Sequence, residues 1–404
     1  MSHFTRYLLL VFYFQAAKLH IFYQFVQVFI NNCLFLIIFL YIYPIFRLNF
    51  VLLHQIMAEK KKIVFIINPI SGNHSKKEIP DLIYQTIDKS QFDYELRLTE
   101  YAGHAAEIAK SCAQEGIDIV VAIGGDGTVN EVARSLVHTR TALGIIPCGS
   151  GNGLARHLCL PMDVKKALRI INDCTIESFD YGVINDLPFF CTCGMGFDAF
   201  ISLKFAEAGK RGPITYVENV LNEGLKYKPE TYEVEDETGA KRYKAFLIAC
   251  ANASQYGNNA YIAPGATMKD GEMDVIIMEP FDALDAPQIA ADLFMKTLGN
   301  NSKIKTFRTK QLRIHRKEPG AIHYDGDPIM TDKDIEVHIE HLGINILTNP
   351  EMTEDSGQPN FLLNAFSDFF NNINNVREDF TQDIEKGGRK IQAINRVLLR
   401  KLRN

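Results

Sequence analysis

The chain has 404 residues, a length typical of two domains with extra segments at the ends. Apolar residues make up 47% of it and charged residues 23%, which excludes a disordered, collagen-like or disulfide-scaffold protein. The formal net charge of −5 gives no support to a broad nucleic-acid-binding surface, so we expect no nucleic acid partner. The eight cysteines show neither metal-ligand spacing nor a secretory pattern, which favours a reducing cytosol.

Residues 1–56 differ from the rest of the chain. They contain no Asp, Glu or Gly, yet they carry ten Phe and five Tyr. The segment Cys33–Leu53 is just long and apolar enough to span a bilayer, so a membrane anchor is one interpretation. Met57 is followed by a short charged lead and then a strand pattern, as at a natural start. We favour this second interpretation, in which residues 1–56 are a mis-called upstream extension.

Residues 57–180 alternate between strand and helix patterns. Apolar runs of strand length cover 63–67, 94–99, 117–123 and 143–146. Helical spacing of apolar residues covers 78–88, 104–115 and 128–138. This alternation predicts an α/β domain with a parallel sheet and helices on its faces. Such sheets bind ligands beyond the carboxyl ends of their strands.

Residues 181–349 change to a β-rich pattern, which predicts a sandwich-like second domain. The β-like runs are Phe189–Gly194, Thr231–Val234, Ala245–Ala251, Met273–Met278, Gln311–His315, Ile335–Ile339 and Ile344–Leu347. Hairpin turns are expected at Asp236–Gly239 and Lys269–Glu272, and helices near 197–226 and 284–297. Residues 350–404 form a polar tail that ends in a basic amphipathic helix, 386–404, a pattern that suits a membrane surface or docking on the chain itself.

Three glycine-containing loops follow strands of the first domain. Their sequences are Asn68-Pro-Ile-Ser-Gly72, Gly124-Gly-Asp-Gly-Thr-Val-Asn130 and Pro147-Cys-Gly-Ser-Gly-Asn152. Because the carboxyl ends of parallel strands meet at one edge of the sheet, we expect the loops to converge. Glycines let phosphates approach the backbone, and helix N-termini offer N–H groups to them. There is no P-loop and no dinucleotide fingerprint after the first strand.

Asp126 lies inside the second glycine loop. A carboxylate beside bound phosphates is repulsive unless a divalent cation or a proton lies between them, so this residue indicates a metal-assisted site. The alternative is that Asp126 merely caps the helix that starts there.

The motifs together resemble the diacylglycerol kinase catalytic domain, which the bacterial soluble diacylglycerol kinases share with the sphingosine and ceramide kinases. The resemblance covers about residues 61–348. It rests on the three loops above, on Thr99-Glu-x-x-Gly-His104-Ala and on Glu131 after the second loop.

The resemblance implies which residues bind ATP and Mg²⁺. The ATP-binding positions are Asn68, Pro69, Ile70, Ser71, Gly72, Thr99, Gly124, Gly125, Asp126, Gly127, Thr128, Val129, Asn130 and Ser150. Ser150 replaces the usual threonine, and Gly153 stands where an acid is common. The magnesium positions are Thr267, Asp270 and Glu272, the first and last through backbone carbonyls. A plain hairpin is the alternative for this turn.

His323-Tyr-Asp325-Gly-Asp327 resembles the segment that places the family's general base near the acceptor hydroxyl. Asp327 is one methylene shorter than the common Glu, so Asp325 and Asp327 both stay candidates for the base. Asp126 is the third catalytic candidate, as an organiser of charge. On the residues alone, Asp-Gly before a strand is also typical of a simple turn.

The resemblance implies a lipid kinase that transfers the γ-phosphoryl group of ATP to the hydroxyl of a lipid such as diacylglycerol or a sphingoid base. The alternatives are an NAD kinase-like enzyme and a non-catalytic ATP-binding module. NAD kinases usually have an Asn-Glu pair further downstream than Asn130-Glu131. A non-catalytic module would have lost the acidic residues, which are present in this chain. We expect a cytoplasmic protein at the inner membrane face, and the sequence leaves open whether it forms a homodimer.

Overall fold

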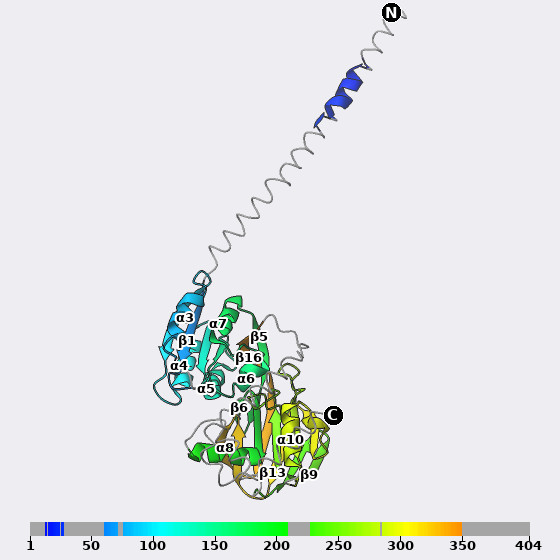
Figure 1. Cartoon of the computed structure of the whole chain (residues 1–404). Helices are drawn as coiled ribbons and strands as arrows, with labels where there is room; N and C mark the ends of the chain where they lie inside the picture. The colour runs from blue at the N-terminus through cyan, green and yellow to red at the C-terminus, as the bar shows by residue number, and fades with distance from the viewer. Residues whose placement is uncertain are drawn as a thin grey trace, which may run out of the picture. The chain divides into compact units, whose positions relative to one another are not determined.

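The computed structural model of the chain describes residues 13, 15–24, 26–27, 60–71, 76–208, 227–282 and 285–349. The chain divides into two units, Met1–Lys60 and Lys61–Asn404 (Figure 1). In the first unit residues 15–24 are helical, and no helix among the described residues is long and apolar enough to cross a membrane. Most of the predicted upstream extension or anchor, and all of the predicted tail, lie outside the described residues.

The second unit begins with a parallel α/β arrangement, which we call the parallel half (residues 61–175). Its elements are β1 (Lys61–Ile67), α3 (Ile79–Thr86), β2 (Phe92–Leu98), α4 (His104–Gln114), β3 (Ile119–Gly124), α5 (Asp126–Leu136), β4 (Ala142–Pro147), α6 (Gly153–His157) and α7 (Val164–Asp173). The four strands are parallel in the order β2-β1-β3-β4. Each predicted strand and helix of this half is present, with its ends shifted by a few residues.

Both faces of the parallel sheet are covered. Residues of α4 and α5 share one buried apolar cluster with β1, β3 and β4, and residues of α3 and α7 share another with the opposite face. All six residues of β3 are buried, which explains its continuous apolar run in the sequence.

The rest of the unit is the sandwich half (residues 176–349), built mainly of antiparallel strands. Its strands are β5 (Ile176–Ile184), β6 (Leu187–Phe189), β7 (Thr192–Gly196), β8 (Glu230–Asp236), β9 (Gly239–Ala245), β10 (Leu247–Ala251), β11 (Met273–Met278), β12 (Ile304–Thr309), β13 (Gln311–Arg316), β14 (Gly320–Tyr324), β15 (Asp327–Thr331) and β16 (Asp334–Leu347). Its helices are α8 (Phe197–Ala208), α10 (Ala286–Phe294) and the short η2 (Leu298–Asn300).

Two sheets form the sandwich. One is six-stranded, in the order β12-β11-β10-β7-β14-β15, and the other continues the parallel sheet through β16, β13, β8 and β9. Apolar side chains of both sheets share one buried cluster. The predicted fold class, a parallel α/β domain followed by a β-rich sandwich-like domain, is confirmed.

Strand β16 joins the two halves. Near its end it pairs with β4 in parallel, through Ile346 and Leu143. Before an irregularity between Glu340 and Ile344 it pairs with β13 and β5 in antiparallel. The two strand runs predicted near the end of the sandwich are therefore one long strand that bends between the halves.

Two other local predictions are wrong. The run Phe189–Gly194 is not one strand, because β6 ends at Phe189 and β7 starts at Thr192. The turn at Lys269–Glu272 is not a hairpin, because it ends a long connection between β10 and β11. The first break occurs where backbone N–H groups bind a distant carboxylate, and local sequence patterns do not reveal such contacts.

Candidate functional site

The three glycine-containing loops lie side by side at the carboxyl ends of β1, β3 and β4, and we call them the rim. The rim consists of residues 68–71, 124–128 and 147–153. The Asn68 amide donates from Nδ2 to Thr128 Oγ1 at 3.0 Å, which ties the first loop to the second. The N–H of Cys148 donates to the Gly124 carbonyl at 2.7 Å, which ties the second loop to the third. The structure thus brings together the loops that the sequence singled out.

The second and third loops approach so closely that glycine is required at their contact. A Cβ atom on Gly149 would lie 2.6 Å from the Gly125 Cα and 2.9 Å from Asn152 Oδ1. No side chain fits there without moving the backbone. The glycines of this motif therefore have a packing role in addition to any contact with a phosphate.

Asp126 lies in the first turn of α5, and its carboxylate binds the third loop. Oδ2 accepts the N–H of Asn152 at 2.8 Å, and Oδ1 accepts the N–H of Gly153 at 2.7 Å. In the described part of the chain no side chain caps the start of α5 at Gly125, so the alternative that Asp126 caps its own helix is wrong. Asp126 instead holds the second and third loops together.

The other predicted nucleotide residues differ in their accessibility. Ile70 is 90% exposed, and Gly127 and Ser150 are exposed on the rim. Thr99 is buried beside the end of β1, where its N–H donates to Ile67 at 2.9 Å. Gly72 lies outside the described residues.

Val129 and Asn130 do not reach the rim surface. Both side chains are buried in α5, and Val129 is part of the apolar core. The N–H of Val129 is used within the helix, donating to the Gly125 carbonyl at 3.1 Å. These two positions therefore support the rim from beneath.

Lys76 contacts the first loop of the rim, and the sequence analysis did not identify it. Its ammonium group donates to the Asn68 carbonyl at 2.7 Å and also contacts the Ser71 carbonyl and hydroxyl. Burial lowers the pKa of Lys76 below its ordinary value, although Cys148 opposes this shift. The buried ammonium group of Lys76 stabilises the first loop by these contacts and adds positive charge next to the rim.

The segment 323–327, which we call the acid turn, connects β14 to β15. Asp325 is held in it by three backbone donors: Phe190 at 2.8 Å, Cys191 at 2.7 Å and Thr192 at 3.1 Å. Burial raises the pKa of Asp325, although Arg134 and these donors act in the opposite direction. Gly326 follows with φ of +84°, which glycine adopts without strain. Asp325 therefore organises the turn through both of its oxygens.

Asp327 has a different environment. Its side chain is half exposed, and Oδ2 accepts from Arg134 Nη1 at 3.0 Å. Oδ1 accepts no hydrogen bond from the part of the chain that the structure describes. Arg134 comes from the last turn of α5 in the parallel half, and the sequence analysis did not identify it.

The rim and the acid turn meet at Cys191. Its N–H binds Asp325, and its Sγ would lie 3.4 Å from a Cβ added to Gly153, whose own N–H binds Asp126. Burial raises the pKa of the Cys191 thiol, and the charges of Asp325 and Asp126 raise it further. Two residues therefore link the carboxylate of the second loop to that of the acid turn.

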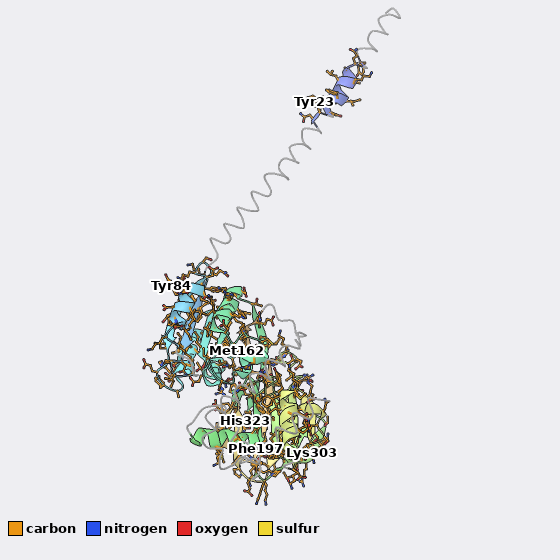
Figure 2. The ribbon with its side chains drawn as sticks, in the orientation of Figure 1. Tyr23, Tyr84, Met162, Phe197, Lys303 and His323 are labelled. Atoms are coloured by element: carbon orange, nitrogen blue, oxygen red, sulfur yellow. The ribbon has the colours of Figure 1, made fainter. Side chains whose placement is uncertain are left out.

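A buried histidine supports the acid turn from the other side. His323 is 2% exposed, and its Nε2 lies 3.0 Å from Asp198 Oδ2 at the start of α8 (Figure 2). The N–H of Gly326 donates to His323 Nδ1 at 3.4 Å, and the Tyr256 hydroxyl donates to Asp198 Oδ2 at 3.3 Å. The sequence analysis did not identify this pair, because Asp198 is 125 positions away from His323.

The predicted magnesium turn holds an arginine. Asp270 Oδ1 accepts the N–H of Glu272 at 3.1 Å, and its Oδ2 pairs with the Arg308 guanidinium. Arg308 also lies 3.5 Å from Glu272 and 3.9 Å from Asp274. The described residues contain no group of three or more His, Cys, Asp or Glu side chains that could hold a metal ion. The predicted ligand set has one carboxylate, that of Asp270, and two backbone carbonyls, those of Thr267 and Glu272. It stays a prediction, with the Arg308 guanidinium beside Asp270.

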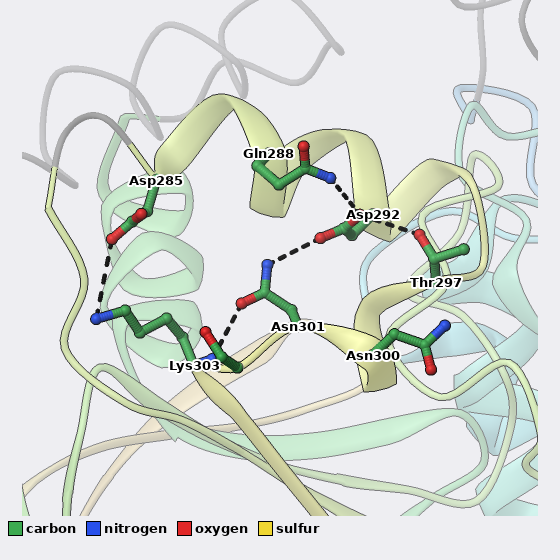
Figure 3. Close-up of a pocket in the computed structure, with 8 residues that line it drawn as sticks. Asp285, Gln288, Asp292, Thr297, Asn300, Asn301 and Lys303 are labelled. Atoms are coloured by element: carbon green, nitrogen blue, oxygen red, sulfur yellow. Dashed lines mark hydrogen bonds and ion pairs between the residues drawn. The ribbon is translucent and has the colours of Figure 1, made fainter. Parts of the chain in front are cut away.

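A separate polar cavity of about 320 Å³ lies between α10, η2 and the start of β12 (Figure 3). At its centre the buried carboxylate of Asp292 accepts from Gln288 at 2.6 Å, Thr297 at 3.0 Å and Asn301 at 2.8 Å. None of the predicted site residues lines this cavity. Its polar groups bind one another, as in a structural network.

Comparisons with known proteins match two consecutive parts of the chain. Residues 62–184 match the model of the diacylglycerol kinase catalytic domain, and residues 192–340 match that of the YegS C-terminal NAD kinase beta sandwich-like domain. The diacylglycerol kinase of Bacillus subtilis (strain 168) is 24% identical over 66% of this chain and 90% of its own length. That of Staphylococcus saprophyticus is 27% identical over 70% of this chain and 90% of its own length.

A solved diacylglycerol kinase structure from Bacillus anthracis str. Sterne has the same fold. It matches with a TM-score of 0.58 at 19% identity, over 73% of this chain and 100% of that one. The two domain models cover the parallel half and the sandwich half in order, and the named relatives span both. The chain therefore belongs to the diacylglycerol kinase catalytic-domain family of lipid kinases.

Proposed function

We propose that the protein is an ATP-dependent lipid kinase, which transfers the γ-phosphoryl group of ATP to the hydroxyl of a lipid such as diacylglycerol or a sphingoid base. The proximity of the rim to the acid turn, from Asp126 through Gly153 and Cys191 to Asp325, is the observation that supports this proposal. A glycine-rich rim suited to phosphates lies next to a turn with two carboxylates. Phosphoryl transfer needs such a pairing of a phosphate site with a proton acceptor.

The rim suits the phosphates of ATP, which carries a divalent metal ion such as Mg²⁺. The first N–H groups of α5 have no acceptor within the helix, and the helix dipole adds positive charge at the same end. Buried Lys76 adds a full positive charge beside the first loop. These features support anion binding at the rim.

Asp327 is the proposed proton acceptor. Three backbone donors occupy the oxygens of Asp325, whereas Oδ1 of Asp327 is available within the described part of the chain. The hydroxyl oxygen of the lipid attacks the γ-phosphorus, and the bond to the oxygen between the β- and γ-phosphorus breaks. The hydroxyl proton passes to Asp327, and the products are ADP and a lipid phosphate.

A phosphotransfer assay tests the function. Purified protein is incubated with radiolabelled ATP and Mg²⁺ and, in turn, diacylglycerol in detergent micelles, sphingosine in detergent micelles and NAD in solution. Label in either lipid, lost in Asp327→Asn, is the expected result. Label in NAD would establish the NAD kinase alternative, and label in no acceptor would favour a non-catalytic module. The proposed location of the protein, at the cytoplasmic face of a membrane, is tested by sedimentation of the protein with anionic vesicles.

A further inference from the structure

Arg134 connects the two halves of the proposed site. It belongs to the last turn of α5, but each of its three guanidinium nitrogens donates to the sandwich half. Nη1 donates to Asp327 at 3.0 Å, Nη2 to the Tyr324 carbonyl at 3.4 Å and Nε to the Pro188 carbonyl at 3.2 Å. The guanidinium carbon also lies 4.4 Å from the centre of the Tyr324 ring. One side chain therefore holds the acid turn at several points.

Helix α5 sets the distance between this contact and the rim. Asp126 is in its first turn and Arg134 in its last, eight residues further along. At a rise of about 1.5 Å per residue, the helix separates them by roughly 12 Å. One face of α5 is buried in the core of the parallel half, so the helix is not free to shift. The rim and the acid turn are thus fixed to opposite ends of one rigid element.

We propose that Arg134 is a positioning residue for phosphoryl transfer, which fixes the carboxylate of Asp327 at a set distance from the rim. This inference rests on the proposed function. The planar guanidinium of an arginine presents several donors in a fixed geometry, so it can hold several acceptors of one turn in place. Because the nitrogens of Arg134 are directed to the acid turn and to Pro188, the residue acts through Asp327 rather than by binding ATP.

The ion pair is too exposed to serve mainly for folding. The side chain of Arg134 is 20% exposed and that of Asp327 is 50% exposed, and ion pairs open to water contribute little to stability. Small displacements of a reacting group, in contrast, cost much in rate. A positioning role therefore predicts a large effect on turnover together with a small effect on thermal stability.

The experiment compares Arg134→Ala and Arg134→Lys with a matched control, Arg242→Ala. Arg242 pairs with Glu233 at 2.9 Å on the β8–β9 hairpin and contacts no residue of the proposed site. For each protein we would measure kcat, the KM for ATP and for lipid, the thermal midpoint, and hydrogen exchange of the peptide covering 320–331. The double variant Arg134→Ala/Asp327→Asn completes the set.

We expect Arg134→Ala to lower kcat by about 10- to 100-fold, with the KM for ATP within about twofold of wild type. Arg134→Lys keeps the charge but loses the planar fork, so it should restore only part of the rate. Added guanidinium ion should restore part of the rate in Arg134→Ala, and NaCl at equal ionic strength should not. The double variant should be no slower than Asp327→Asn alone, because both changes affect the same group. Exchange in 320–331 should rise in Arg134→Ala and stay unchanged in Arg242→Ala.

Three results would overturn the inference. The first is a kcat for Arg134→Ala within twofold of wild type. The second is a raised KM for ATP at unchanged kcat, which would make Arg134 a nucleotide-binding residue. The third is unchanged exchange in 320–331. If wild type phosphorylates no lipid while Arg134→Ala still raises exchange in the acid turn, the proposed function fails and Arg134 keeps its role in fixing the turn.

Discussion

In the rim, the contacts join three short loops that each follow a strand, whereas in the acid turn they join two carboxylates to distant segments, the backbone of residues 190–192 and the side chain of Arg134. Gly125 and Gly149 meet backbone to backbone, and Asp126 binds two consecutive N–H groups. Asp327, in contrast, depends on a helix nearly 200 positions earlier. The rim is therefore encoded locally in short motifs, and the acid turn is encoded by the tertiary fold.

The two carboxylates of the acid turn provide the sharpest contrast, and their amide variants should give the largest effect. Asp327→Asn should lower turnover by about 10²–10⁴ at unchanged ATP affinity, because the proton acceptor acts only in the transition state. Asp325→Asn should instead lower the free energy of unfolding by about 1–3 kcal/mol, because its amide cannot accept three N–H groups as well as a carboxylate does. Micelle kinetics, nucleotide titration and urea unfolding separate the two outcomes. A larger loss of turnover in Asp325→Asn, at wild-type stability, would make Asp325 the base.

Asp126 tests whether the rim depends on its loop-to-loop contacts. Asp126→Ala should reduce turnover by about 10²–10³ and raise the KM for ATP, since the second and third loops lose their shared carboxylate. Asp163→Ala is the matched control: Asp163 caps α7 by accepting the N–H of Lys166 at 2.8 Å, away from the rim. That control should lose about 1 kcal/mol of stability and keep its turnover. Near-normal turnover in Asp126→Ala would show that the rim does not need this carboxylate.

The same contrast explains how much could be predicted from the sequence. Alternating strand and helix patterns predicted the parallel half, and glycine motifs predicted the rim, because both depend on neighbouring residues. Arg134 and Lys76 were missed, and so was the partner of His323, because each of these roles comes from a contact between distant positions. The magnesium turn was placed by resemblance, and the cross-strand position of Arg308 opposite Asp274 was not visible in any local motif. Patterns in a single sequence do not reveal contacts between side chains that are far apart in the chain.

His157 extends the comparison to the contact between the third loop and the sandwich half. It ends α6, and its Nδ1 accepts the N–H of Ser254 at 3.1 Å. Burial lowers the pKa of His157 to about 4, whereas the unfolded chain has a value of about 6.5. The unfolded state therefore binds the proton more tightly than the folded state. The free energy of unfolding has its full value above pH 6.5, and it decreases as the pH falls toward 4.

The expected result is a shallower pH dependence in His157→Asn. Between pH 7 and pH 5, wild type should lose roughly 1–2 kcal/mol more stability than the variant, as measured by urea unfolding at each pH. His315→Asn, on the exposed face of β13, is the control and should follow wild type. Equal slopes for wild type and His157→Asn would contradict the assignment.

The smallest effect concerns Arg308, whose guanidinium lies beside Asp270, where the resemblance to the family implies a metal ion. Without nucleotide, EDTA should leave the thermal midpoint of wild type unchanged within about 1 °C, because the guanidinium already balances Asp270, Glu272 and Asp274. Arg308→Gln should lose less than about 1 kcal/mol, since the side chain of Arg308 is 44% exposed and its ion pairs are screened by water. For a domain of this size the thermal midpoint should therefore fall by less than roughly 2–4 °C.

The response to Mg²⁺ decides between an arginine and a metal ion in this turn. In Arg308→Gln three carboxylates are left without their cation, so Mg²⁺ should raise the midpoint of the variant more than that of wild type. Arg313→Gln, which loses an exposed pair with Glu336, is the control and should show no such response. If EDTA lowers the wild-type midpoint by several degrees and Asp270→Asn removes that effect, the turn binds a metal ion as the resemblance implies. Arg308 would then lie outside the coordination shell, and its contacts with the carboxylates would not replace the ion.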